Sequence, residues 1–212
     1  MLTTWARTFF RGFLETIGRF FVRVGVTPNQ LTLVGLFLQA VVAAVIATGW
    51  LQLGGVLLIL FSIFDAFDGT VARLTGKVSR FGAFFDSTLD RYAEAFVLFG
   101  LLIYETGQPG TRTEVLLIYV SIVGSLLVSY TRAKAESLGI KCMEGILTRA
   151  ERVALLAVGL LLSPYQFWVL PNSMTIVLWL LAILSNVTAL QRIWAVWKAT
   201  QDERQDGSST GG

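Results

Sequence analysis

Four aspartates lie inside stretches of sequence that are otherwise apolar. Two fall near the end of a run from about Leu53 to Leu74, and two near the start of a run from about Gly82 to Tyr104. The four residues are Asp65, Asp68, Asp86 and Asp90. An ionised aspartate at the centre of a membrane helix costs on the order of 2.5–3.5 kcal/mol. The protein must therefore supply an interaction that offsets this cost.

Helical spacing groups these carboxylates on two faces that can meet. One face of the earlier run carries residues spaced i, i+3, i+4 and i+7, namely Asp65, Asp68, Gly69 and Ala72. Steps of four in the later run group Gly82, Asp86 and Asp90. The short connection makes the runs antiparallel neighbours, so the carboxylates reach a similar depth. They repel one another unless divalent cations bridge them, and oxygen ligands favour magnesium, manganese or calcium over zinc.

Two simpler interpretations of this region remain open. The small residues Gly69, Ala72 and Gly82 also allow membrane helices to pack closely, without any ligand beside them. The aspartates could instead form salt bridges with nearby arginines, which are Arg73, Arg80 and Arg91. We favour a functional site, because clusters of ionisable residues within membrane segments are functional by default.

The composition restricts what other chemistry is possible. The 212 residues include no histidine and one cysteine, Cys142. This excludes Ser-His-Asp and Cys-His catalysis, His-ligated zinc and an internal disulfide. Hydrophobic residues make up 54% of the chain and charged residues 15%, whereas a typical soluble domain carries about 25% charged residues. The composition therefore predicts a membrane protein that works with its acids and bases.

We predict an all-α, polytopic membrane protein with six transmembrane helices, preceded by an interfacial amphipathic helix. Each apolar run is long enough to cross a bilayer. The runs extend over about Leu31–Trp50, Leu53–Leu74, Gly82–Tyr104, Val115–Lys134, Ala150–Leu170 and Met174–Trp197. The six-helix domain is expected over residues 25–200, and the polar tail 201–212 is expected to be disordered.

Residues 1–24 favour a juxtamembrane helix that lies in the headgroup region of the bilayer. Charged side chains recur there in steps of four, at Arg7, Arg11, Glu15, Arg19 and Arg23. Aromatic and aliphatic residues fill the other faces, which is typical of an interfacial amphipathic helix. An amphipathic helix packed on the rest of the protein would show the same pattern.

The distribution of basic residues predicts the orientation in the membrane. With six crossings, all of the 17 basic residues except Arg112 and Arg91 fall on one side. Basic residues concentrate in cytoplasmic loops. We therefore expect a multi-pass protein of the cell membrane, with both termini and the aspartate site on the cytoplasmic side and with no nucleic-acid partner.

The aspartates belong to a longer pattern that resembles a known family signature. The pattern fills eight positions within 26 residues: Asp65, Asp68, Gly69, Ala72, Arg73, Gly82, Asp86 and Asp90. It is similar to the signature of the CDP-alcohol phosphatidyltransferases, and Thr27-Pro28-Asn29 before the first apolar run also resembles members of that family. The resemblance implies six membrane helices, a homodimer, and transfer of a phosphatidyl group from CDP-diacylglycerol to an alcohol with release of CMP.

The resemblance also assigns roles to the residues of the pattern. It implies a site for two Mg²⁺ ions, which Mn²⁺ can replace, with four ligands: Asp65, Asp68, Asp86 and Asp90. Asp90 would also be the catalytic base for the acceptor hydroxyl. The nucleotide site would be formed by Asn29, Asp68, Gly69, Ala72, Arg73 and Gly82, with the Arg73 guanidinium on the pyrophosphate.

The acceptor is less sharply defined than the donor. Asp90-Arg91, the stretch Ser129–Glu136 and the stretch Gly145–Arg152 resemble the branch of the family that uses inositol phosphate. This implies that inositol 1-phosphate is converted to phosphatidylinositol phosphate. The candidate ligands of the acceptor phosphate are Arg132, Lys134, Arg149 and Arg152. These bases could also serve only to keep their loops on the cytoplasmic side, without binding an acceptor. Glycerol 3-phosphate and serine remain alternative acceptors.

Two interpretations come from other classes of protein. A cation transporter would also place acids in membrane helices, although transport sites usually lie near the midplane. A membrane scaffold would have no use for four costly carboxylates at this spacing. We therefore expect a metal-dependent enzyme of phospholipid synthesis.

Overall fold

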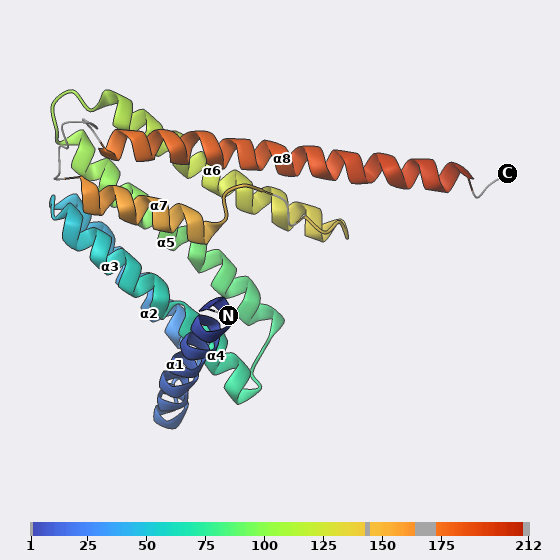
Figure 1. The fold of residues 1–212 in the computed structure, drawn as a ribbon, viewed down its shortest axis with the longest axis horizontal. Coiled ribbons are helices and arrows are strands. Elements are labelled where there is room, and N and C mark those ends of the chain that lie inside the picture. The colour runs from blue at the N-terminus through green and yellow to red at the C-terminus, as the bar shows by residue number, and fades with distance from the viewer. Residues whose placement is uncertain (1, 143–144, 164–172, 210–212) are drawn as a thin grey trace. The chain divides into compact units, whose positions relative to one another are not determined.

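The structure is a computed structural model that describes residues 2–142, 145–163 and 173–209. All regular structure in these residues is helical and no strand is present, as the all-α prediction requires (Figure 1). In chain order the helices are α1 (Leu2–Val24), α2 (Pro28–Ala47), α3 (Leu51–Phe64), α4 (Ala66–Thr75), α5 (Arg80–Thr106), α6 (Arg112–Ser137), α7 (Arg149–Leu162) and α8 (Ser173–Ser209).

The helices form two compact units. The first unit is Met1–Tyr104 and holds α1 to α4 with most of α5, and the second is Glu105–Gly212 and holds α6 to α8. The sequence predicts one domain over residues 25–200, whereas packing divides that range near the end of α5. The four aspartates belong to the first unit, and the four candidate acceptor bases belong to the second.

Four of the six predicted membrane crossings have the length and composition of a membrane span. They are Pro28–Ala47, Leu51–Thr75, Arg112–Ser137 and Ser173–Gln201. The third predicted crossing is covered by α5, whose 27 residues extend over about 40 Å. Its charged residues, which include Asp86 and Asp90, lower its hydropathy. The fifth crossing coincides in part with α7, and residues 164–170 lie outside the description, so both crossings stay predictions.

The span Leu51–Thr75 is interrupted at one residue, Asp65. This residue separates α3 from α4, yet its φ of −55° and ψ of −26° are helical. The amide of Asp65 still bonds the Phe61 carbonyl at 3.3 Å. The chain therefore crosses this position without changing direction into a loop, and the first aspartate of the pattern lies at the junction.

A capping box starts α2 at Thr27, shortly before the first apolar run. The Thr27 amide donates to Gln30 Oε1 at 2.8 Å, and the Gln30 amide donates to Thr27 Oγ1 at 3.4 Å. Pro28 occupies the first turn, where no amide donor is needed. This arrangement fixes the start of α2 and places Asn29 in its first turn.

A tight turn joins α4 to α5. Gly76 ends α4 in the left-handed region, with φ of +65°, and the Lys77 amide bonds the Ala72 carbonyl at 3.0 Å. Ser79 begins α5, because its Oγ accepts a hydrogen bond from the Gly82 amide at 2.9 Å. The turn holds the end of α4 near the start of α5, and the antiparallel packing of the two runs stays a prediction.

The N-terminal helix α1 packs on protein along one face. Its residues Leu14, Ile17, Phe21 and Val22 contact a buried cluster formed by Leu31, Phe67 and Val71. On another face, Phe20 and Val24 are 60% and 62% exposed. The alternative of an amphipathic helix packed on protein therefore describes one face of α1, and the location of its other face in a bilayer stays a prediction.

In the second unit, α8 packs against both α6 and α7. The Asn186 amide group on α8 donates to the Val120 carbonyl on α6 at 3.3 Å. A Cβ at Gly124 would lie 2.7 Å from Asn186 Nδ2, so α6 and α8 come close there. At its far end α8 continues to Ser209. The disorder of the tail 201–212 stays a prediction.

Gly100 allows backbone contact between α5 and α2. A Cβ there would lie 2.7 Å from the Ala43 Cα and closer still to its carbonyl oxygen. We expect Gly100→Ala to lower the free energy of unfolding by about 1–3 kcal/mol through overpacking, measured as a lower Tm in detergent. The control is Gly12→Ala, whose Cβ meets nothing within 4 Å. Equal Tm values for the two variants would contradict this contact.

Candidate active site

A cavity of about 360 Å³ in the first unit collects most of the predicted donor-site residues. It lies between the first turn of α2, the helix α4 and the start of α5. Its wall includes all six residues predicted for the nucleotide site, together with Asp86: Asn29, Asp68, Gly69, Ala72, Arg73, Gly82 and Asp86. Residues that are up to 57 positions apart in the sequence therefore share one cavity.

Asp68 is the most enclosed carboxylate of the pattern, with 8% of its surface exposed. The Thr32 hydroxyl on α2 donates to its Oδ2 at 2.8 Å, and the Gly69 amide donates to its Oδ1. Asp65 and Asp86 are both near enough to repel it electrostatically. The carboxylate is thus held in a fixed direction by two donors, while two other negative charges act on it.

The other two carboxylates lie outside the cavity wall. Asp65 points against α2, because a Cβ at Gly35 would lie 2.7 Å from Asp65 Oδ1. Asp90 is half-buried one helical turn beyond Asp86 on α5. In the part of the chain that the structure describes, no group of three or more acidic or cysteine side chains is already arranged around a metal position.

The glycines of the pattern keep the cavity open. A Cβ at Gly69 would meet only Arg73 Nη1, at 3.7 Å, so it would project into free space. A Cβ at Gly82 would lie 3.1 Å from Ser79 Oγ and 3.7 Å from Asn29 Oδ1. Side chains at these two positions would occupy space that a ligand could otherwise use.

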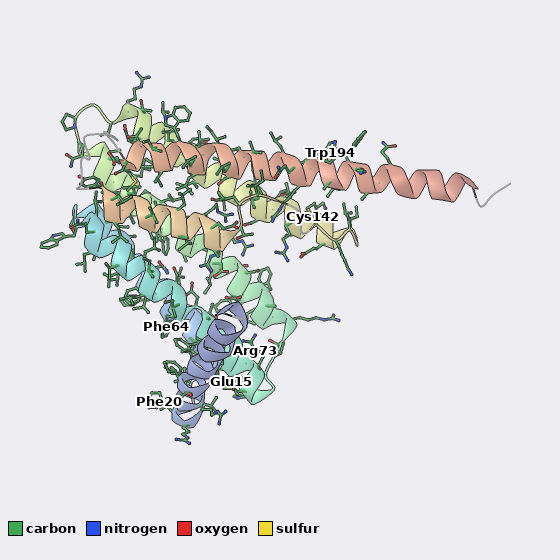
Figure 2. The ribbon with its side chains drawn as sticks, in the orientation of Figure 1. Glu15, Phe20, Phe64, Arg73, Cys142 and Trp194 are labelled. Atoms are coloured by element: carbon green, nitrogen blue, oxygen red, sulfur yellow. The ribbon has the colours of Figure 1, made fainter. Side chains whose placement is uncertain are left out.

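Two cationic side chains line the cavity beside the carboxylates. Arg73 is exposed and donates from Nη2 to Thr70 Oγ1 at 3.2 Å (Figure 2). Lys77, from the turn after α4, was not predicted as a site residue and also lines the wall. The sequence showed it only as one of several cytoplasmic bases. The cavity therefore combines carboxylates that can bind cations with bases that can bind phosphate oxygens.

In the second unit, two of the predicted acceptor bases gather around a third arginine. Arg132 and Arg152 both interact electrostatically with Arg192 on α8. Arg152 and Arg192 are 3% and 6% exposed, and they donate to the carbonyls of Leu147 and Val128. The structure thus adds Arg192 to the candidate acceptor site. Its charged side chain within an apolar run could have indicated a functional residue from the sequence alone.

The other two candidate ligands of the acceptor phosphate are Lys134 and Arg149. Lys134 is exposed on the last turn of α6, and Arg149 is half-buried at the first residue of α7. Arg132 also forms an exposed ion pair with Glu136 at 2.8 Å. Arg132 and Arg152 share Arg192 as an electrostatic neighbour, and the gathering of all four bases in one cavity stays a prediction.

Comparison with known proteins identifies the class of this protein. The sequence profile of the CDP-alcohol phosphatidyltransferases matches residues 25–187, which include both units. The chain belongs to the CDP-alcohol phosphatidyltransferase family and is a transferase of phospholipid synthesis. Family membership replaces the transporter and scaffold interpretations.

Individual relatives are similar over nearly the whole chain. Archaetidylinositol phosphate synthase of Pyrococcus horikoshii is 35% identical over 186 residues, which are 87% of this chain and 91% of that protein. Phosphatidylinositol phosphate synthase of Mycobacterium tuberculosis is 33% identical over 193 residues, which are 91% of this chain and 89% of that protein.

Crystal structures of the Mycobacterium tuberculosis synthase are also similar to this structure. The structure with CDP-DAG bound matches with a TM-score of 0.81 at 33% identity, covering 87% of this chain and 93% of that one. The structure in complex with manganese and citrate matches with the same TM-score and identity, covering 87% and 88%.

Thr32 lies outside the family pattern, yet its hydroxyl orients Asp68. We expect Thr32→Val to lower transferase activity about tenfold, as loss of a hydrogen bond to a functional ligand does. CMP release by purified protein measures the effect. Thr32→Ser keeps the hydroxyl and should retain most of the activity. Full activity in Thr32→Val would show that the hydrogen bond has no role in orienting Asp68.

Proposed function

We propose that this protein transfers the phosphatidyl group of CDP-diacylglycerol to inositol 1-phosphate, forming phosphatidylinositol phosphate and CMP. The observation that carries the proposal is the cavity whose wall contains Asp86 together with the six residues predicted for the nucleotide site, Asp68 and Arg73 among them. The relatives named for inositol phosphate products, and the related structure with CDP-DAG bound, support the choice of donor and acceptor.

The carboxylates suit a pair of divalent cations. The ligands would be Asp65, Asp68, Asp86 and Asp90, with Mg²⁺ as the resident ion and Mn²⁺ as a substitute. The donor set is oxygen only, which fits these ions, and the repulsion of Asp68 by Asp65 and Asp86 is the kind that a cation relieves. When bound, the ions would neutralise the pyrophosphate and polarise its phosphorus. The manganese complex of a relative supports this assignment.

The side chains of the protein would bind the nucleotide and activate the acceptor. Gly69, Ala72 and Gly82 leave room for the nucleotide, while Arg73 and Lys77 place cationic donors on its phosphates. Asp90 takes the proton of the acceptor hydroxyl. The freed oxygen attacks the phosphorus that carries the diacylglycerol, the bond from this phosphorus to the bridging oxygen breaks, and CMP leaves.

The basic residues of the second unit would bind the acceptor phosphate. Arg132, Arg152 and Arg192 are electrostatic neighbours, and guanidinium groups bind phosphate oxygens in pairs. Lys134 and Arg149 would complete this set. Three neighbouring guanidinium groups favour a phosphorylated acceptor over serine, because guanidinium groups form paired hydrogen bonds with phosphate oxygens.

The arrangement in the membrane extends this proposal. Six membrane helices, including α5 and α7, would place both termini and the cavity on the cytoplasmic side of the cell membrane, where the basic residues concentrate. A water-soluble acceptor could then meet a donor whose acyl chains stay in the bilayer. Resemblance to the family supports a homodimer.

The acceptor is tested by CMP release from CDP-diacylglycerol and Mg²⁺ with inositol 1-phosphate, glycerol 3-phosphate, serine or inositol as the second substrate. We expect release with inositol 1-phosphate to exceed release with each of the others at least tenfold, because phosphate and polyol are both recognised. Release with glycerol 3-phosphate or serine, and none with inositol 1-phosphate, would overturn the acceptor assignment while leaving the family assignment intact.

The base is tested by Asp90→Asn. We expect this variant to lose turnover by at least a factor of 100, since no other group of the pattern takes the acceptor proton, and to keep most of its affinity for CDP-diacylglycerol. Asp86→Asn, one helical turn earlier in the cavity wall, should lose donor binding as well. Binding is measured as the rise in Tm with CDP and Mg²⁺. Normal turnover by Asp90→Asn would disprove the assignment of the base.

A further inference from the structure

An aromatic cluster connects α1 to the end of α3 and the start of α4, next to two of the carboxylates. The Phe21 ring on α1 lies edge-on to Phe64 and Phe67, with centroid distances of 6.1 and 5.8 Å. Phe64 and Phe67 are themselves 5.7 Å apart (Phe64 is labelled in Figure 2). They directly precede Asp65 and Asp68 in the sequence. The residues that carry these two rings are therefore joined directly to the two aspartates.

A second contact brings α1 against the middle of α4. A Cβ at Gly18 would lie 3.0 Å from Thr70 Cγ2 and 3.1 Å from Leu74 Cδ1. Val71, between them in sequence, is fully buried in the same contact region. The two helices are therefore as close as a residue without a side chain allows.

The helix α4 depends on such contacts for its orientation. It has only ten residues, and isolated helices below about 12–15 residues are marginal in water. It follows α3 through Asp65, whose backbone stays helical, so packing on α1 adds to the constraint that α3 provides. Packing on α1 buries one side of α4 and leaves Asp68, Gly69 and Ala72 facing the cavity.

We propose that Phe21 is a positioning residue for Asp68, the carboxylate of α4. The cluster of Phe21, Phe64 and Phe67 sets the rotation of α4, and thereby directs Asp68 into the cavity where the cations and the nucleotide would bind. This inference rests on the proposed function, since it assumes that this carboxylate binds metal. It gives α1 a role in the chemistry that is separate from contact with the membrane surface.

The test compares three variants by Mn²⁺ titration in the presence of CDP, followed by electron paramagnetic resonance, and by the Mg²⁺ dependence of CMP release. Phe21→Ala should weaken Mn²⁺ binding about tenfold, as loss of support for metal ligands does, and change the KM for the acceptor less than twofold. Phe21→Leu fills the same space and should stay within about threefold of the unchanged protein. Val24→Ala shortens a side chain on the same helix at a position that is 62% exposed and should have no effect.

The other possible results would contradict either the role of Phe21 or the metal site itself. Unchanged Mn²⁺ binding by Phe21→Ala, or an equal loss in Val24→Ala, would overturn the positioning role. Should Phe21→Ala fail to fold, Gly18→Val replaces it, because its Cβ would already lie 3.0 Å from Thr70 Cγ2 and its two further methyl groups need more room between α1 and α4. This variant must weaken Mn²⁺ binding, and a normal titration curve would overturn the proposal. Absence of Mn²⁺ binding by the unchanged protein would instead disprove the metal site and both proposals together.

Discussion

Repulsion between carboxylates in an apolar protein is the constraint on which the site depends. Asp68 is almost fully buried and experiences the charges of Asp65 and Asp86. Only part of this cost is offset by the Thr32 hydroxyl and the Gly69 amide. The uncompensated negative charge of these carboxylates favours the binding of cations in the cavity. Its neighbours Arg73 and Lys77 then make it a place where cations and phosphates can be held together.

The helix ends around the cavity provide the rigidity that such a site needs. The capping box at Thr27 fixes the start of α2, the left-handed Gly76 ends α4, and Ser79 starts α5. Each device satisfies backbone groups that would otherwise need water. Helix α1 closes the opposite side of α4 through the Phe21 cluster. The carboxylates are thus placed by backbone geometry and apolar packing rather than by contacts among themselves.

The sequence predicted the local parts of this arrangement well, because spacing along a helix determines which residues share a face. The six residues predicted for the nucleotide site line one cavity. Thr32 and Phe21 were missed, since their partners lie 36 and at least 43 positions away, and no periodicity reports such contacts. Arg192 was counted only among the bases that set the orientation in the membrane. Its neighbours Arg132 and Arg152 come from other helices, so the sequence does not show them together.

The central claim is that the four aspartates bind divalent cations next to the nucleotide. Anomalous X-ray scattering from crystals grown with Mn²⁺ and CDP measures this directly. The account predicts two manganese peaks within coordination distance of the carboxylates of Asp65, Asp68, Asp86 and Asp90, with the CDP phosphates beside them. Manganese bound elsewhere, or CDP bound in the cavity without any manganese peak, would contradict it.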